Sequence, residues 1–155
     1  MKTKLLIFLI LFTACKSLHE TKTNIQKPPV EIEIVQVENE MIFTLTNNST
    51  DTIRVINPKK LNLQRMQDNE WQNLKILNCP CDAPCNAPKE SISIDSNQQY
   101  IFKWNKKESW CGKRTSYSIR ETIEQPVDPG NFKVLISVKK QDQSIEIISK
   151  EFEIK

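Results

Sequence analysis

Residues 41–56 read MIFTLTNNSTDTIRVI, and this stretch decides the fold class of the 155-residue chain. Apolar and polar residues alternate along residues 41–46 and again along residues 52–56, where β-branched side chains are frequent. A period of two is typical of a β-strand with one buried face. The residues between the two runs, NNSTD, are short polar residues that favour turns. The stretch therefore predicts two strands joined by a turn.

The same alternation continues on both sides of this stretch. No segment after the first fifteen residues keeps apolar side chains at helical spacing over three turns. Many strands at regular spacing predict an all-β fold, a single antiparallel β-sandwich of immunoglobulin-like type over residues 30–155. The predicted strands cover residues 30–37, 41–46, 52–56, 61–66, 71–77, 91–94, 100–104, 115–120, 132–138 and 145–154.

A different pattern occupies the first fifteen residues, MKTKLLIFLILFTAC. Two lysines precede an apolar run over residues 5–12, and the small residues Thr13 and Ala14 lead into Cys15. The run is too short to cross a bilayer as a helix, which needs about 20 apolar residues. It therefore predicts an export signal rather than a membrane span.

The end of this signal, FTAC, resembles the lipobox at which lipoprotein signal peptidase cleaves, although Phe12 stands where that family usually has Leu. The resemblance covers only this N-terminal region. It implies that residues 1–14 are a signal peptide and that Cys15 becomes the first mature residue. It also implies lipid on the Cys15 sulfur and, usually, an acyl chain such as palmitate on its nitrogen. Two or three acyl chains, at about 0.8 kcal/mol per buried CH₂, hold a protein durably on a membrane.

Residues 15–29 form a polar segment that ends in two prolines, which we interpret as the lipidated N-terminus and a flexible tether. Lys16 follows the cysteine where an aspartate would indicate inner-membrane retention in some bacteria, and this favours the outer membrane of a cell envelope. Without Lys2 and Lys4 the formal charge falls from +3 to about +1. Because no basic stripe with interleaved aromatic residues is present, nucleic acid is not an expected partner.

The order of elements resembles small bacterial immunoglobulin-like lipoprotein domains and, more loosely, the intracellular proteinase inhibitors with that type of sandwich. The likeness lies in FTLTNNSTDTIRV at residues 43–55, Trp71, YIFKW at residues 100–104 and VDPGNFKVLISV at residues 127–138. It implies the sandwich fold. No inhibitory residue carries over, and the cysteine segment departs from the inhibitor pattern.

Four cysteines remain once Cys15 is assigned to lipid: Cys79, Cys81, Cys85 and Cys111. An even number in an exported chain predicts disulfides. A bond between Cys79 and Cys81 would be strained, because one intervening residue does not allow the required Cα spacing. We therefore expect Cys111 to bond either Cys79 or Cys81, and Cys85 to bond the other. Closing a loop of about 30 residues stabilises a fold by roughly 3 to 4 kcal/mol on the entropic argument.

The alternative use of these four cysteines is a thiolate site for Zn(II) or Cu(I), since soft sulfur ligands select those ions. The spacing lacks the paired knuckles that zinc sites favour, and an oxidising compartment removes thiolates. A redox site would need a C-x-x-C motif, or a histidine or basic run beside the cysteines to lower a thiol pKa, and the sequence has neither. We therefore predict disulfides and no metal or other cofactor.

Catalytic constellations are scarce in this sequence. The only histidine, His19, lies in the tether, so no Ser-His or Cys-His pair can form within the domain. Glu31 with Glu33, and Glu151 with Glu153, lie at strand spacing on what reads as a solvated face. The glycines, Gly112 and Gly130, are too few for a phosphate-binding loop. We expect a protein that is not an enzyme.

The three tryptophans divide into two groups. Trp71 and Trp104 lie on predicted strands and are expected in the core, whereas Trp110 is expected in a loop beside Cys111. Trp110 is thus a candidate ligand contact, and the adjacent Lys113 and Arg114 are candidates for contact with an acidic partner.

These residues predict an interaction surface formed by residues 78–89 together with residues 110–114, because rigid scaffolds present function on loops. The predicted function is that of a lipid-anchored, non-catalytic binding or structural accessory domain. Its expected partners are the membrane, through the anchor, and an envelope protein or peptide. Metal handling by the four cysteines and inhibition of an envelope protease through residues 79–88 are the alternatives.

Overall fold

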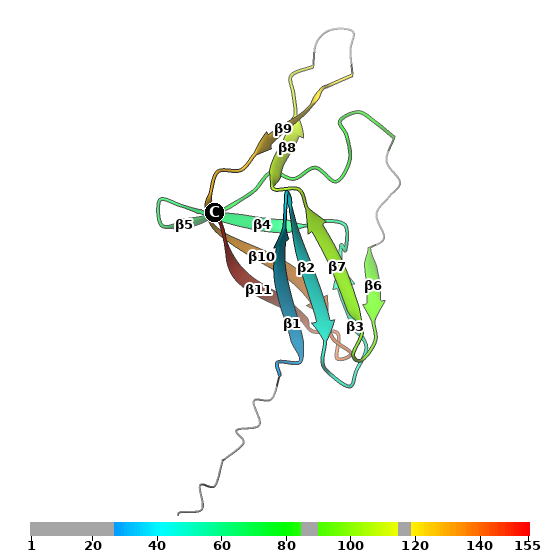
Figure 1. Cartoon of the computed structure of the whole chain (residues 1–155). Coiled ribbons are helices and arrows are strands. Elements are labelled where there is room, and N and C mark those ends of the chain that lie inside the picture. The colour runs from blue at the N-terminus through cyan, green and yellow to red at the C-terminus, as the bar shows by residue number, and fades with distance from the viewer. Residues whose placement is uncertain (1–26, 85–89, 115–118) are drawn as a thin grey trace, which may run out of the picture.

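The computed structural model describes residues 27–84, 90–114 and 119–155. The predicted signal peptide, Cys15, most of the tether and Cys85 lie outside these residues. The strands are labelled in Figure 1: β1 (Val30–Val37), β2 (Glu40–Asn47), β3 (Ile53–Ile56), β4 (Asn62–Gln67), β5 (Glu70–Asn73), β6 (Ser91–Ile94), β7 (Gln99–Trp104), β8 (Lys107–Cys111), β9 (Thr122–Pro126), β10 (Gly130–Lys139) and β11 (Ile145–Ile154). The described ranges contain no helix long and apolar enough to cross a membrane. The all-β prediction is confirmed.

Two antiparallel sheets hold most of the strands. The first has the order β1-β2-β7, and the second has the order β5-β4-β10-β3-β6, with β11 along the other edge of β10. β4 and β3 pair with successive parts of β10, because residues 57–61 separate them. β8 and β9 form a separate antiparallel pair that projects from one end of the sheets (Figure 1).

The core lies between the two sheets because the inward positions of their strands are apolar. The buried residues of the central strands are Met41, Phe43, Leu45, Phe132, Val134, Ile136 and Val138. Rings from opposite sheets meet there: the centroids of Phe43 and Phe152 are 5.4 Å apart, and those of Trp104 and Phe132 are 5.8 Å apart. Burial of each large apolar side chain contributes about 1.5 to 3 kcal/mol. The fold is thus a β-sandwich, and Trp104 is in its core as predicted.

Trp71 is outside the core, contrary to the prediction. It lies on β5, which pairs only with β4, and it is half-buried. Lys133 stands 3.9 Å from the centroid of the Trp71 ring. Because Phe132 and Val134 point into the core, Lys133 between them points outward. The Trp71 ring therefore covers a lysine on the outer face of the sheet, as a cation–π contact.

The predicted strand boundaries also differ from the structure between β5 and β9. The strand predicted over residues 71–77 ends at Asn73, and the following residues run beside β8 without joining a sheet. Of the strand predicted over residues 115–120, residues 115–118 lie outside the described residues, and Ile119 and Arg120 are not in a strand. The sequence reading missed β8 and β9, which flank that region and place Trp110 on a strand instead of a loop.

A buried asparagine organises the end of the sandwich at which the described chain begins. Asn47, at the end of β2, is fully buried, and its Nδ2 donates hydrogen bonds to the carbonyls of Asp51 at 2.7 Å and Ile94 at 3.0 Å. Its Oδ1 accepts hydrogen bonds from the Ser49 backbone N–H at 3.1 Å and the Ser49 hydroxyl at 2.6 Å. The Asn97 backbone N–H donates to the Asn47 carbonyl at 2.7 Å. One neutral side chain therefore ties the turn after β2 to the end of β6.

We call this region the Asn47 end, defined as residues 27–29, 47–51 and 95–98. Figure 1 shows β8 and β9 at the opposite end of the molecule. The first described residues are held at the Asn47 end by hydrogen bonds from Asn48, whose backbone N–H donates to the Pro29 carbonyl at 2.8 Å. The described chain therefore begins at the end of the sandwich that is remote from Cys81 and Cys111.

Candidate functional site

A disulfide joins Cys81 to Cys111, whose Cα atoms are 5.6 Å apart. Thirty positions separate the two cysteines in the sequence. This is one of the two pairings that the sequence allowed for Cys111. Cys79 is also disulfide-bonded, and the expected partnership of Cys85 falls outside the described residues. The disulfide links the segment after β5 to the tip of β8.

We call this region the disulfide end, defined as residues 79–84, β8, β9, residues 112–114 and residues 119–121. Its segments are joined by hydrogen bonds as well as by sulfur. The Cys81 backbone N–H donates to the Thr122 hydroxyl at 2.9 Å, and the Leu77 backbone N–H donates to the Ser109 hydroxyl at 2.8 Å. The Ser109 backbone N–H in turn donates to the Lys75 carbonyl at 2.7 Å. The segment after β5 is therefore joined to β8 and β9 largely by hydroxyl side chains, without the regular backbone ladder that joins β8 to β9.

An ionic cluster centred on Asp82 lies next to the disulfide. The Arg120 guanidinium contacts both Asp82 oxygens, with Nη2 at 2.7 Å from Oδ1 and Nε at 3.2 Å from Oδ2. The Arg120 backbone N–H donates to Oδ2 at 3.0 Å, and Arg114 Nη2 lies 3.3 Å from the same oxygen. The φ of Asp82 is 53°, in the left-handed region that Asp tolerates better than most residues. This backbone conformation places the carboxylate next to the two arginines.

These contacts favour the charged form of Asp82 strongly. Hydrogen bonds from the Arg120 guanidinium lower the pKa of Asp82 most, followed by the hydrogen bond from the Arg120 backbone and then by Arg114. The same carboxylate raises the pKa of Arg120. The Asp82 side chain is only 17 % exposed, whereas the side chains of Arg114 and Arg120 are 69 % and 39 % exposed. The arginines thus cover the carboxylate and remain open to solvent themselves.

The three predicted contact residues differ in their surroundings. Trp110 is half-buried on β8 opposite Ile123, with Lys75 Nζ 5.7 Å from its ring centroid. Lys113 is exposed, and no residue within the described ranges forms a hydrogen bond or ion pair with its side chain. Arg114 is exposed and belongs to the Asp82 cluster. The structure therefore brings Lys113 and Arg114 to one exposed edge and makes Trp110 part of the support beneath it.

Asp82 and Arg120 are the residues of this region that sequence reasoning missed. A signal for them was present, because Asp82 directly follows a cysteine and three cations occur in the nine residues that follow Cys111. A disulfide between these segments brings their opposite charges together. The sequence left the pairing of Cys111 open, so it did not specify which carboxylate would meet which cation.

The metal alternative includes Cys85, which lies outside the described residues. None of the described residues form a group of three or more His, Cys, Asp or Glu side chains arranged to hold a metal ion. The Cys81–Cys111 bond also occupies two of the sulfur atoms that a thiolate site would use. Metal binding through all four cysteines would therefore require reduction of that bond first.

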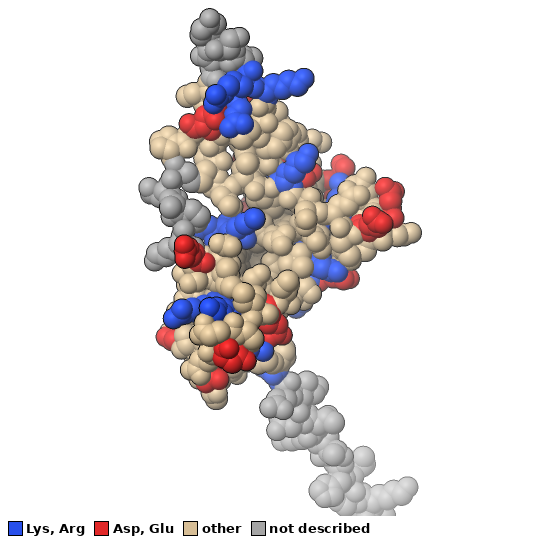
Figure 2. Space-filling model, turned by 180° about the vertical axis from the view of Figure 1, so that it is seen from behind, with Lys and Arg blue, Asp and Glu red and all other residues tan. Residues whose placement is uncertain are grey.

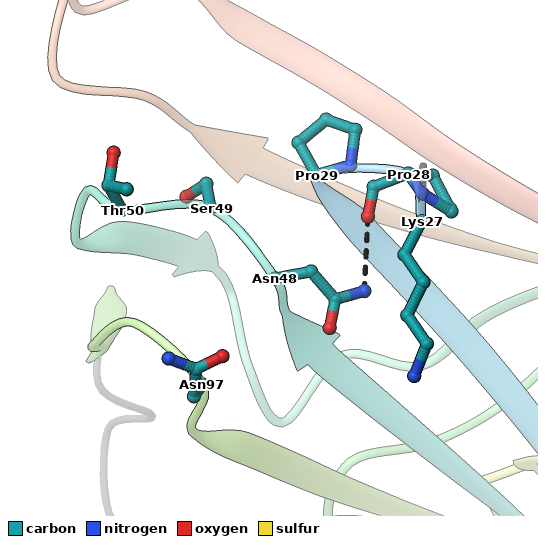
Figure 3. A pocket seen from close by; sticks show the side chains of 7 residues that line it. All are labelled: Lys27, Pro28, Pro29, Asn48, Ser49, Thr50 and Asn97. Carbon is teal, nitrogen blue, oxygen red and sulfur yellow. Dashed lines mark hydrogen bonds between the residues drawn. The ribbon is translucent and has the colours of Figure 1, made fainter. Parts of the chain in front are cut away.

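A shallow hollow lies at the other end of the molecule (Figure 3). It is lined by Lys27, Pro28, Pro29, Asn48, Ser49, Thr50 and Asn97. Asn48 Nδ2 donates to the Pro28 carbonyl across it at 3.0 Å. Because this bond holds the first described residues against the turn after β2, we assign the hollow a structural role.

Comparison with known proteins adds no assignment. No family model matches this chain, and a search of curated proteins finds no significant match. The resemblance to immunoglobulin-like lipoprotein domains and proteinase inhibitors therefore stays a prediction. Functional inference rests on the geometry of the disulfide end.

Proposed function

We propose that this protein is a lipid-anchored protein of the bacterial cell envelope that acts as a non-catalytic binding domain. Its binding surface is the exposed edge of the disulfide end, formed by Lys113, Arg114 and Arg120. The proposal combines the lipobox-like sequence before Cys15 with the architecture of the described domain. It assigns the sandwich the role of a rigid support and the disulfide end the role of contact.

The main support for this proposal is that the first described residues and the disulfide end lie at opposite ends of the domain. The described chain begins at the Asn47 end, whereas β8 and β9 project from the other end (Figure 1). From Cys15 to Lys27 an extended chain spans at most roughly 40 Å. A domain anchored through Cys15 would therefore present its Asn47 end to the membrane and its disulfide end to the surroundings.

The cross-links at the disulfide end also favour binding. The Cys81–Cys111 bond and the Asp82 cluster hold residues 79–84 against β8 and β9. A surface that is held in one conformation before it meets a partner loses less conformational entropy on binding. Loops on a rigid scaffold are where binding proteins usually place their contacts.

The anchor is tested in cells grown with an alkyne analogue of palmitate. The wild-type chain is expected to acquire the label and to sediment with membranes. Cys15→Ala should lose both properties, whereas Cys81→Ser with Cys111→Ser should keep the label. Equal labelling of Cys15→Ala would contradict the lipid anchor.

The binding surface is tested with a photo-crosslinking amino acid at position 113 or at position 141. Gln141 lies in the turn between β10 and β11, remote from the disulfide end, and is a matched exposed control. We expect a discrete adduct from position 113 that excess unlabelled protein suppresses, and none from position 141. Adducts of the same size and yield from both positions would contradict a binding surface at the disulfide end.

A further inference from the structure

We infer that the disulfide end recognises an acidic polypeptide, through Lys113, Arg114 and Arg120. This inference rests on the proposed function, because it names the chemistry of the partner for the same surface. It follows from how many hydrogen-bond donors the cluster contains and how few of them the described residues use.

The donors exceed the acceptors at this surface. A guanidinium has five N–H donors, and a carboxylate accepts about four hydrogen bonds. Arg120 uses Nε and Nη2 on Asp82, and Arg114 uses Nη2. The other guanidinium N–H groups of both arginines, and the Lys113 ammonium, have no acceptor in the part of the chain that the structure describes. These unused donors are available to a carboxylate from another molecule.

Asp82 orients the arginines without neutralising them. Its two oxygens already accept the Arg120 backbone N–H, the Arg120 guanidinium and Arg114, so its acceptor capacity is full. At the exposed edge itself, Lys113, Arg114 and Arg120 face Asp82 and the exposed Glu121, which leaves a surplus of one positive charge. The rest of β8 and β9 adds Lys107, which pairs with Glu124, and Glu108, so the surplus is confined to this edge. The space-filling view from behind shows Lys and Arg side chains gathered at this end beside one acidic group (Figure 2).

The geometry favours carboxylates on a polypeptide over phosphates on a membrane. The planar fork of Arg pairs with a carboxylate through two parallel hydrogen bonds, and the contact of Arg120 with Asp82 already shows this geometry. The surface also lies at the end of the molecule opposite the Asn47 end, where the described chain begins. A protein held by Cys15 would therefore point these donors away from its own membrane.

The test uses the full-length processed protein in detergent micelles and a fluorescent decapeptide rich in Asp and Glu. Binding is measured by fluorescence anisotropy at low ionic strength. The same peptide with Asn and Gln in place of the acids serves as the neutral probe. We expect only the acidic peptide to bind, with an affinity that falls as salt is added, since exposed charges are screened.

Variants locate the binding site. Lys113→Gln with Arg114→Gln should weaken binding of the acidic peptide by about tenfold, which is the loss expected for two charged contacts. Lys59→Gln with Lys60→Gln removes another adjacent pair of exposed cations and should leave binding within about twofold. Both double variants change only exposed side chains, and the thermal unfolding of each confirms that it is folded.

Three results would overturn the inference. One is no preference for the acidic over the neutral peptide, and another is equal loss of binding in the two double variants. The third is displacement of the peptide by inorganic phosphate where chloride of equal ionic strength has no effect, which would assign the surface to phosphate. If crosslinking from position 113 persists in any of these cases, the proposed binding function stands and only the acidic chemistry is rejected.

Discussion

The two ends of this sandwich hold separate segments of the chain together with different interactions. At the Asn47 end a fully buried neutral side chain joins turns through hydrogen bonds between groups that do not titrate. At the disulfide end a covalent bond and a partly exposed ionic cluster join segments that no common sheet connects. The comparison teaches that the Asn47 end belongs to the hydrophobic core, whereas the disulfide end is an addition to it. The two ends should therefore respond differently to reductant, mutation and pH.

The largest effect is expected from loss of the disulfide. Cys81→Ser with Cys111→Ser should lower the free energy of unfolding by roughly 3 to 4 kcal/mol, because the unfolded chain regains the entropy of an open loop of about 30 residues. Urea unfolding of the oxidised wild-type protein and the double variant measures this difference. A loss below about 1 kcal/mol would show that the disulfide end contributes little to global stability.

Asn47→Ala should have the next largest effect, about 2 to 3 kcal/mol, because it leaves the buried Ile94 carbonyl and the part-buried Ser49 N–H without their partner. Urea unfolding again provides the measurement. Asn48→Ala is the matched control, since Asn48 is half-buried and its side chain donates to the accessible Pro28 carbonyl. If the two variants lost equal stability, burial of Asn47 would not be the reason for its importance.

Acid should loosen the disulfide end before the Asn47 end. The pKa of Asp82 is lowered in the folded state, so its stabilising contribution is complete above its ordinary pKa of 3.8. That contribution is lost as the pH falls from there through the lowered pKa. In an NMR titration the Arg120 amide, which donates to Asp82, should shift over this acidic range while the Ser49 amide stays constant.

Asp82→Asn is the control for this titration, because an amide side chain does not ionise. The Arg120 amide of that variant should show no comparable shift on acidification. Parallel shifts of the Arg120 and Ser49 amides in the wild-type protein would indicate general unfolding and remove the contrast between the ends.

The smallest effect is expected from the ion pair between Lys140, which follows β10, and Glu146, on β11. Glu146 raises the pKa of Lys140, chiefly through their hydrogen bond, so the contribution of the pair is complete below the ordinary pKa of 10.5 and is lost as the pH rises from there through the raised pKa. Both side chains are more than two-fifths exposed, and solvent screens such pairs. Lys140→Gln should leave the melting temperature unchanged within error at neutral pH. A clear drop would show that isolated surface pairs matter here as much as the Asp82 cluster.

Local sequence pattern predicted most of the sheets because alternation of apolar and polar residues is a property of a single strand. β1, β6 and β11 match their predicted boundaries, and the Asp68–Asn69 turn of the β4–β5 pair forms with positive φ at both residues. The prediction that Trp71 is in the core was wrong because its burial depends on which face of an edge strand meets the other sheet. β8 and β9 were missed because they are mixed in composition and are stabilised by hydrogen bonds to the segment after β5.

Only the part of the candidate site that depends on residues close together in the sequence was predicted. Residues Lys113 and Arg114 stand out in the sequence because two cations follow a cysteine. Asp82 and Arg120 are 38 positions apart, and no local pattern relates them. Their pairing needs the Cys81–Cys111 bond, a positive φ at Asp82 and a chain that returns to the same end.

The sequence by itself determined the all-β class, the positions of most strands and the set of cysteines open to pairing, and it predicts an export signal before Cys15. Each of these depends on residues that are neighbours in the chain. Only the tertiary structure decided that Cys81 is the partner of Cys111, that Asn47 is buried, and that Asp82 aligns two arginines. These features depend on contacts between distant segments, and such contacts form only when two sheets pack around one core.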